Sequence, residues 1–291
     1  MTGMQWTWTG RDGSAWDLTA GRVRLDKRPV GGVGEPEWVR SVRSSAGQSG
    51  QRRTAWSTAK ARAGFLPFFL AETEPAARVA TEAAWWASWD VDFPGTLTIT
   101  QPDGSSRSIA ACLQDDADYE PAKDPYTRPT DKLAVNWVAD DPWWRGPAVV
   151  RTFGQQASQN FFGTRYGPPF FISSSNILAT ATLTNSGDID APVLITVMGP
   201  ATGFDFTISG HRVAGSIPVV AGASLLLDSD VRHLSATSLA TDGTRTDVTR
   251  QLAVADFARI PRKSTVPLTA QLTGSGSVTV RHEPRYRRAW G

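Results

Sequence analysis

The sequence is poor in cysteine and histidine, and it has no long apolar run. Its one cysteine, Cys112, excludes an intramolecular disulfide framework and a cysteine-based zinc site. No apolar stretch approaches the roughly 20 residues that a membrane-spanning helix requires. The first residues lack the basic and apolar regions of a signal peptide, so we expect the protein to be made and folded in a cytoplasm.

A strong charge imbalance is also missing. The formal net charge is +2 over 291 residues, with many arginines and few lysines. A balance this weak does not by itself indicate nucleic-acid binding. The apolar content of 40% is that of a packed fold, and the length suits one large or two ordinary domains.

Recognisable catalytic and cofactor motifs are absent. No strand leads into a glycine-rich dinucleotide or phosphate loop, and there is no Gly-x-Ser-x-Gly elbow or EF-hand pattern. The histidines, His211, His233 and His282, are scattered beside arginines, which favours surface or structural roles. No nucleophile is set up beside them. We therefore expect no catalytic residue, no metal site and no cofactor.

Tryptophan, in contrast, is abundant and unevenly placed. The chain has twelve tryptophans, and all of them precede residue 145 except Trp290. This asymmetry predicts two domains, at residues 1–147 and 148–291. In the first, MQWTWTG, RAGFLPFFL, TLTITQPDGSSRSIAACL and KLAVNWVAD read as strands and hairpins. One helix is predicted at about residues 74–89, with Thr73 as its N-cap and Pro75 in its first turn.

Residues 30–63 lack the periodicity of a helix or a strand. The stretch is rich in glycine, serine and arginine. Loops longer than about 12–15 residues in compact domains are usually functional or disordered. Two interpretations stand: a solvated loop, or an arm that a neighbouring subunit orders. The candidate contact residues of such an arm are Arg40, Arg43, Arg52, Arg53, Trp56 and Arg62.

The segment VADDPWWRGP, residues 138–147, combines carboxylates with aromatic rings at the end of the first domain. Tryptophans beside paired carboxylates are typical of sugar-cleaving sites, but the same residues also suit a rigid junction between domains. The candidate junction residues are Asp140, Asp141, Pro142, Trp143 and Trp144. The other acidic candidates for catalysis are Asp115, Asp116, Asp118 and Glu120, which resemble a solvated strand exit.

After Pro147 the pattern becomes uniformly β. Short alternating runs are separated by turn signals such as Asn185-Ser186-Gly187-Asp188 and Asp242-Gly243. Regular spacing of this kind predicts an antiparallel sandwich. The ending VRHEPRYRRAWG admits polyanion binding, but we favour a final strand with solvated arginines and packed Tyr286 and Trp290.

Taken in order, these pieces resemble the distal tail protein family of long-tailed bacteriophages, also known as phage tail or minor tail proteins. The resemblance covers nearly the whole chain. It rests on the WDL hairpin, the Gly/Arg-rich arm, RAGFLPFFL, the single helix and the strand ending in VADDPWWRGP. The second half contributes NSGDIDAPVLITVMGPATGFDFTISG, VVAGASLLLDSD and the basic-aromatic ending. No single motif is diagnostic, so the resemblance lies in the ordered set.

The resemblance implies a mainly β protein. A β-sandwich-like ring, or belt, domain with one helix and an extended arm would precede a galectin-like jelly-roll sandwich. It also implies a structural virion protein of the tail tip or baseplate, forming a hexameric ring around the tape-measure protein. The implied partners are the tail tube protein and the hub or fibre protein. In that setting the two aspartates before Pro142 form a turn and the two indoles seal the seam between domains.

Three hypotheses about function follow. The leading one is a non-enzymatic assembly protein whose arm and sheet edges are satisfied across subunits. The second is a host-surface glycan-binding module, although the second half has almost no tryptophan and lacks the residue set of true galectins. The third is a glycoside hydrolase that pairs Asp115 or Asp116 with Asp140 or Asp141.

Overall fold

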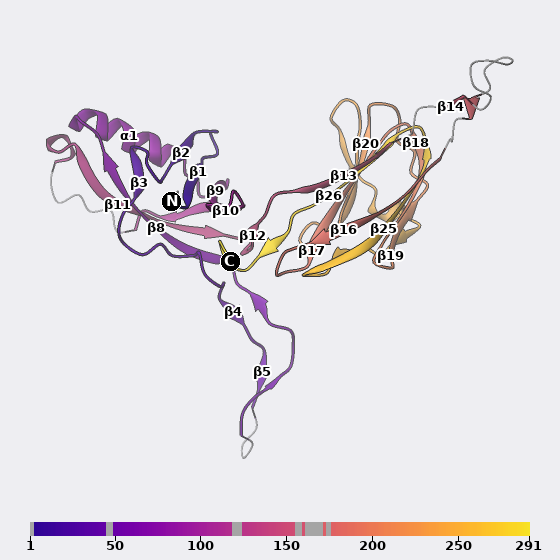
Figure 1. Ribbon diagram of the computed structural model, residues 1–291, viewed down its shortest axis with the longest axis horizontal. Helices are drawn as coiled ribbons and strands as arrows, with labels where there is room; N and C mark the ends of the chain where they lie inside the picture. Colours follow the sequence, from indigo (N-terminus) through magenta and orange to yellow (C-terminus); the bar gives the residue numbers. More distant parts are fainter. Residues whose placement is uncertain (1–2, 45–48, 118–123, 155–158, 161–170, 173–175) are drawn as a thin grey trace. The chain divides into compact units, whose positions relative to one another are not determined.

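The computed structural model describes residues 3–44, 49–117, 124–154, 159–160, 171–172 and 176–291. The chain is mainly β, as predicted, and it divides into two compact units (Figure 1). The N-terminal unit comprises Met1–Gly146 together with Tyr286–Gly291, and the C-terminal unit comprises Pro147–Arg285. We expected the second domain to extend to residue 291, whereas residues 286–291 cluster with the first unit.

The N-terminal unit is built on one antiparallel sheet with the strand order β2-β1-β9-β10-β11-β8-β3, and β12 pairs with β10. The strands are β1 (Gln5–Thr9), β2 (Ala15–Asp17), β3 (Val23–Leu25), β8 (Arg62–Ala71), β9 (Gly95–Thr100), β10 (Ser106–Asp115), β11 (Thr130–Ala139) and β12 (Trp144–Arg145). A 3₁₀ turn, η1 (Pro125–Thr127), precedes β11.

The two edges of this sheet, β2 and β3, follow one another in the chain. Residues 18–22 join them, and the N–H of Leu25 donates to the carbonyl oxygen of Leu18 at 2.8 Å. The sheet therefore nearly closes into a barrel. Closure of this kind removes most of the unpaired edge that an open sheet presents to other chains.

The helix α1 (Pro75–Ala87) begins at its proline, with Glu74 rather than Thr73 in the N-cap position. Its buried side chains are Arg78, Thr81, Glu82 and Trp85, which recur at the helical period on one face. Just after the helix, Trp89 stacks on Trp8 of β1, with ring centroids 3.6 Å apart. The core of the N-terminal unit is therefore largely indole, and all twelve tryptophans belong to this unit.

The C-terminal unit is a sandwich of two antiparallel sheets, as predicted. One has the order β13-β26-β17-β20-β21-β22, with β24 on β17, and the other has the order β16-β25-β18-β19-β23. The first sheet comprises β13 (Val149–Gly154), β17 (Ala191–Met198), β20 (Ser224–Asp228), β21 (Ser235–Leu239), β22 (Arg245–Asp247), β24 (Arg259–Ile260) and β26 (Ser277–His282). The second comprises β16 (Asn176–Asn185), β18 (Ala201–Ile208), β19 (His211–Gly215), β23 (Val254–Ala255) and β25 (Ser264–Gly274).

Three smaller elements complete this unit: the paired strands β14 (Gln159–Asn160) and β15 (Phe171–Ile172), and the 3₁₀ turn η2 (Thr249–Gln251). β27 (Arg285–Tyr286) is the last strand of the chain. Apolar side chains of both large sheets form one continuous core. The buried Asn185 amide donates to the carbonyl oxygens of Ile189 and Ile260, which ties the following loop and the strand β24 to the end of β16.

Candidate interaction arm and its base

Residues 30–63, which lack helical or strand periodicity in the sequence, contain a hairpin whose strands pair with one another. β4 (Trp38–Val39) pairs with β7 (Thr58–Ala59), and β5 (Val42–Arg43) pairs with β6 (Arg52–Arg53). Between these pairs, the hydroxyls of Ser41 and Thr54 lie 2.7 Å apart. We call residues 38–59 the arm. In Figure 1 its outgoing and returning halves run side by side.

Exposure is the defining property of the arm. Every described residue from Val39 to Trp56 is exposed. Trp56 is the extreme case, with 96% of its surface accessible. An isolated two-stranded hairpin is marginally stable at best in water, and a fully exposed indole leaves a large apolar surface in contact with solvent. The arm therefore has the composition and exposure of a surface that a partner covers.

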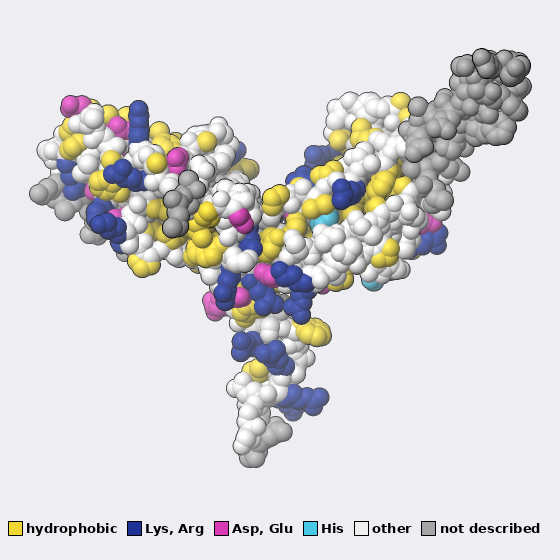
Figure 2. All heavy atoms as spheres, viewed as in Figure 1, with side chains coloured by type: hydrophobic (Ala, Val, Ile, Leu, Met, Phe, Trp, Pro, Cys, Tyr) yellow, Lys and Arg dark blue, Asp and Glu magenta, His cyan; other side chains and the backbone are white. Residues whose placement is uncertain are grey.

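The arm is also uniformly basic. Arg40, Arg43, Arg52 and Arg53 are all exposed, and the sequence has no acidic residue between Glu37 and Glu72. Basic side chains, coloured dark blue, are visible along the arm in Figure 2. Tryptophan and arginine are the residues most enriched at the energetic centres of protein interfaces.

Arg62 differs from the other five residues that we named as arm contacts. It begins β8, and its side chain is buried. Its Nε donates to the carbonyl oxygen of Pro142 at 2.7 Å. Its two terminal nitrogens donate to the carbonyl oxygens of Gly32, Gly34 and Arg287, at 2.8, 2.6 and 2.8 Å. Arg62 thus fastens the base of the arm rather than presenting charge to solvent.

Burial lowers the pKa of Arg62 to about 10, and the nearby Glu35 carboxylate opposes this shift. The guanidinium still carries its charge at neutral pH. A buried cation is tolerated when hydrogen-bond acceptors surround it, and here carbonyl oxygens supply that environment. The base of the arm therefore depends on four backbone carbonyl groups from three separate parts of the chain.

Two glycines, one in each segment that flanks the arm, lie against Trp137. A Cβ atom at Gly64 would lie 2.1 Å from the Trp137 ring, and one at Gly32 would lie 2.5 Å from it. Gly32 also has a φ of +82°, which side-chain-bearing residues rarely adopt. Glycine at both positions lets the two segments that flank the arm pass directly over a buried indole.

The C-terminal residues also reach this base. The N–H of Ala289 donates to the carbonyl oxygen of Val33 at 2.9 Å, and Trp290 meets Trp6 edge-on with centroids 6.1 Å apart. The Arg107 guanidinium donates to the carbonyl oxygen of Arg288 at 2.9 Å and lies 3.8 Å from the centre of the Tyr286 ring. Tyr286 and Trp290 pack, as the sequence suggested, but their neighbours are in the N-terminal unit.

The five predicted junction residues are placed as follows. Asp140 is exposed, while Asp141 is buried in an ion pair with Arg145 at 2.8 Å. Pro142 supplies the carbonyl oxygen that Arg62 binds. Trp144 is fully buried in the N-terminal core, and the Trp143 ring lies 5.7 Å from that of Trp38 at the start of the arm. Both indoles have neighbours in the N-terminal unit, and their expected role at the seam between domains stays a prediction.

The proposed glycosidase carboxylates occupy less suggestive positions. Asp115 accepts hydrogen bonds from the amide of Asn136 and the N–H of Ala117 at the end of β10, and Asp116 is exposed. Asp118 and Glu120 lie outside the described residues. Asp141 is engaged by Arg145, as noted above. These contacts are those of a strand exit and of a structural ion pair.

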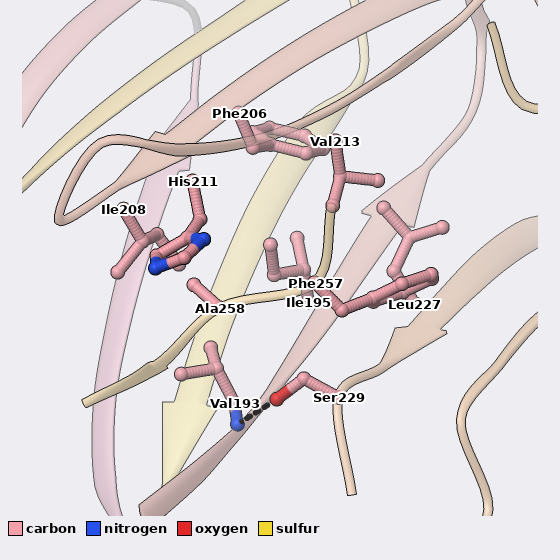
Figure 3. Close-up of a pocket in the computed structure, with 10 residues that line it drawn as sticks. All are labelled: Val193, Ile195, Phe206, Ile208, His211, Val213, Leu227, Ser229, Phe257 and Ala258. Carbon is pink, nitrogen blue, oxygen red and sulfur yellow. Dashed lines mark hydrogen bonds between the residues drawn. The ribbon is translucent and has the colours of Figure 1, made fainter. Parts of the chain in front are cut away.

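The described part of the sandwich contains a small space lined in part by His211 (Figure 3). Its volume is about 10 Å³, and apolar side chains such as Val193, Phe206 and Leu227 line it. Ligand pockets usually measure roughly 300–1,000 Å³, so this space is too small for a sugar ring. His211 itself lies 3.0 Å from both oxygens of Asp256 at the surface.

The described residues also lack a metal-binding cluster and a membrane-spanning helix. Among these residues, no group of three or more histidine, cysteine or acidic side chains has the arrangement of a metal site. None of the helices within the described ranges is both long and apolar enough to cross a bilayer.

Comparison with known proteins supplies the context. No protein-family model and no curated protein matches the chain. Among solved structures, it is similar to the Dit protein of phage SPP1, whose structure is described as a paradigm of the hub adsorption apparatus in phages that infect Gram-positive bacteria. The match has a TM-score of 0.62 at 14% identity and covers 98% of this chain and 99% of that one. The chain has the distal tail protein fold.

Two structures of the phage P2 baseplate in its activated conformation extend the likeness. The structure with Ca matches with a TM-score of 0.57 at 12% identity, covering 98% of each chain. The structure with Sr matches with a TM-score of 0.56 at 12% identity, covering 97% of this chain and 98% of that one. Both units thus lie within the distal tail protein fold, which confirms the fold that the sequence resemblance implied.

Sequence reasoning missed two parts of this region. The first is Arg62 as the centre of the arm base; the glycines around it, at positions 31, 32, 34 and 64, were a signal of close backbone approach. The second is the return of residues 286–291 to the N-terminal unit. Its only signal was Trp290, the one tryptophan beyond residue 145 in a chain whose other indoles are N-terminal.

Proposed function

We propose that this protein is a structural component of a phage tail tip, in which copies of the chain assemble through their arms into a closed ring. The exposed indole of Trp56 carries the proposal. It stands on a self-paired, arginine-bearing hairpin in which every described residue between Val39 and Trp56 is exposed. The apolar area of such a surface is removed from contact with water only when a partner covers it.

The ring geometry follows from the kind of contact. An arm that projects from one surface and docks on a different surface makes a heterologous interface, and such interfaces close into rings when the rotation between copies allows it. From the resemblance to distal tail proteins we propose six copies around the tape-measure protein. We also propose contacts with the tail tube on one side and a hub or fibre on the other. The role is structural and needs no catalytic residue.

The sandwich unit contributes no comparable surface for sugar among the described residues. The small space lined in part by His211 has a volume of about 10 Å³, and all twelve tryptophans lie in the other unit. Glycan binding by the tail tip therefore stays a prediction from the sequence.

The first test is the mass of the purified chain in solution, measured by light scattering behind size exclusion over a concentration series. A discrete species near six times the chain mass of 31.4 kDa supports the proposal. The matched control replaces residues 39–57 by a short glycine-serine turn, which removes none of the buried side chains in the part of the chain that the structure describes. This control should fold and remain a monomer. A full-length chain that is monomeric at every concentration would contradict arm-driven assembly.

A further inference from the structure

The loop after helix α1 exposes apolar side chains between carboxylates. In the sequence Asp90-Val91-Asp92-Phe93, Val91 is 62% and Phe93 is 51% exposed. Exposed apolar residues occur singly on most protein surfaces, but two of them alternating with two acidic residues make a local patch. We call residues 90–93 the acidic loop.

The acidic loop is held in a defined conformation. One oxygen of Asp90 accepts the N–H groups of Asp92 and Phe93, at 2.8 and 3.0 Å. The other oxygen pairs with Arg11 at 2.9 Å, and the same guanidinium lies 3.6 Å from the centre of the Phe93 ring. These contacts fix the loop in advance, so a partner that binds it meets a small ordering cost.

One further carboxylate, that of Asp140, lies near the loop. The carbonyl oxygen of Asp90 accepts the N–H of Leu113, which places the loop beside the end of β10. Cys112 of β10 pairs with Val138 of β11, two residues before the exposed Asp140. Burial raises the pKa of the Cys112 thiol, and the charges of Asp140, Asp90 and Asp92 raise it further. All three carboxylates therefore lie near Cys112. No ion pair joins Asp92 or Asp140 to a cation within the described part of the chain.

The arm has the complementary composition. It alternates exposed arginines with exposed apolar side chains, among them Val39, Val42 and Trp56. Two other exposed apolar residues, Val150 and Val231, directly precede arginines, and two more, Met198 and Val220, have no charged residue beside them in the sequence. A basic arm would meet like charge at the first two, whereas the acidic loop offers opposite charge and exposed apolar area together.

The arm does not cover the acidic loop of its own chain. Val91 and Phe93 are exposed, and so is every described residue from Val39 to Trp56. The occupant that fits by charge and by apolar surface is the arm of another copy.

We propose that the arm of one copy docks on the acidic loop of its neighbour, with the arginines of the arm facing Asp92 and Asp140 and Trp56 covering Val91 and Phe93. This inference rests on the proposed ring, and it adds the receiving surface. Successive copies would then repeat one arm-to-loop contact around the ring.

A charge-swap experiment tests the contact in the full-length chain. The arm variant carries Arg52→Glu and Arg53→Glu, and the loop variant carries Asp92→Arg and Asp140→Arg. All four side chains are exposed, so both variants are expected to fold. Asp90 is left unchanged because it holds the loop. Each variant alone is expected to be monomeric at concentrations where the wild-type chain assembles.

The equimolar mixture of the two variants is the decisive sample. Each reversed arm then meets a reversed loop on the other variant, and each natural arm meets a natural loop, so the mixture should regain the wild-type mass. The control Glu74→Arg reverses an exposed carboxylate outside the loop and should assemble normally.

The alternative results separate the two proposals. A loop variant that assembles like the wild type overturns the acidic loop as the receiving surface while leaving the arm-built ring intact. A mixture that stays monomeric overturns the pairing of arm and loop in the same way. An arm variant that assembles normally contradicts the arm-built ring itself.

Discussion

The side chain of Arg62 donates from its Nε to the carbonyl oxygen of Pro142, across 80 residues of sequence, at a distance of 2.7 Å. The contact joins the first residue of β8, at the base of the arm, to the proline that precedes β12. The start of β8 and the segment before β12 are therefore held together by one guanidinium group. The stability of this base can be tested separately from assembly.

We expect Arg62→Lys to destabilise the N-terminal unit. An ammonium group cannot reproduce the planar fork that serves four carbonyl oxygens, and buried acceptors left without donors cost about 1–3 kcal/mol each. The expected loss in the free energy of unfolding is on the order of 3 kcal/mol, measured by urea titration followed by circular dichroism. The exposed Arg22, which pairs with Glu72 at 3.5 Å, is the control, and Arg22→Lys should change stability by less than about 0.5 kcal/mol. Equal, small effects at both positions would contradict the role of Arg62.

Two tryptophans should respond in opposite ways to truncation. Trp144→Ala removes a fully buried indole and should cost about 3–5 kcal/mol of stability. Trp56→Ala removes an exposed one and should cost less than about 0.5 kcal/mol. At the interface the order reverses, because a central tryptophan there typically contributes at least about 2 kcal/mol, or roughly 30-fold in affinity. Calorimetric unfolding and the concentration dependence of mass measure the two effects; a Trp56→Ala chain that assembles as well as wild type would remove the main support for the ring.

Deletion of residues 286–291 should weaken the N-terminal unit and loosen the base of the arm. Arg62 and Arg107 each lose carbonyl acceptors, and Trp6 loses its contact with Trp290. We expect faster amide hydrogen exchange in β8 and near Val33, whose carbonyl oxygen binds the N–H of Ala289. The sandwich strands β18 and β25 serve as the internal control and should keep their protection. Unchanged exchange in β8 would show that the last residues do not hold the arm base.

Acid should destabilise the C-terminal unit through His282. Its Nε2 donates to the carbonyl oxygen of Thr184 at 3.0 Å, and its buried Nδ1 has no hydrogen-bond partner among the described residues. Burial holds the pKa of His282 below its ordinary value of 6.5. The unfolded chain therefore binds more protons just below pH 6.5, so stability falls as the pH drops through this window and levels off below the folded-state pKa.

The variant His282→Gln should remove this slope. The amide keeps a donor for Thr184 and does not titrate. His233→Gln, in an exposed turn, is the control that should retain the wild-type pH dependence. Urea midpoints measured by circular dichroism from neutral to mildly acidic pH give the comparison, and parallel curves for His282→Gln and wild type would assign the slope to other groups.

Local pattern was enough to predict most of the secondary structure. The alternation in MQWTWTG and KLAVNWVAD predicted β1 and β11, and Pro75 marked the first residue of the helix. The helix was predicted to run to about residue 89 and ends at Ala87, because Ser88 and Trp89 turn to meet Trp8. The lack of periodicity in residues 30–63 predicted a segment with no face to bury, and residues 38–59 of that stretch form the arm, whereas Arg62 begins β8.

Long-range partners set the limit. In the sequence Arg62 looks like Arg52, yet one is buried and the other exposed. The difference comes from carbonyl groups at positions 32, 34, 142 and 287, which meet only in the folded chain. Similarly, the acidic loop reads locally as the end of a helix. Its importance depends on β10 and β11 bringing Asp140 near it, and no local pattern records that proximity.

The return of Trp290 to the N-terminal unit has a spectroscopic consequence. Every indole of the protein then reports on one unit, while the C-terminal sandwich contributes none. Intrinsic fluorescence excited in the indole band therefore follows the unfolding of the N-terminal unit within the intact chain, without labels or truncation. Among these twelve emitters, Trp56 begins in water, so a blue shift of its emission on mixing would record the moment at which a neighbouring copy covers the arm.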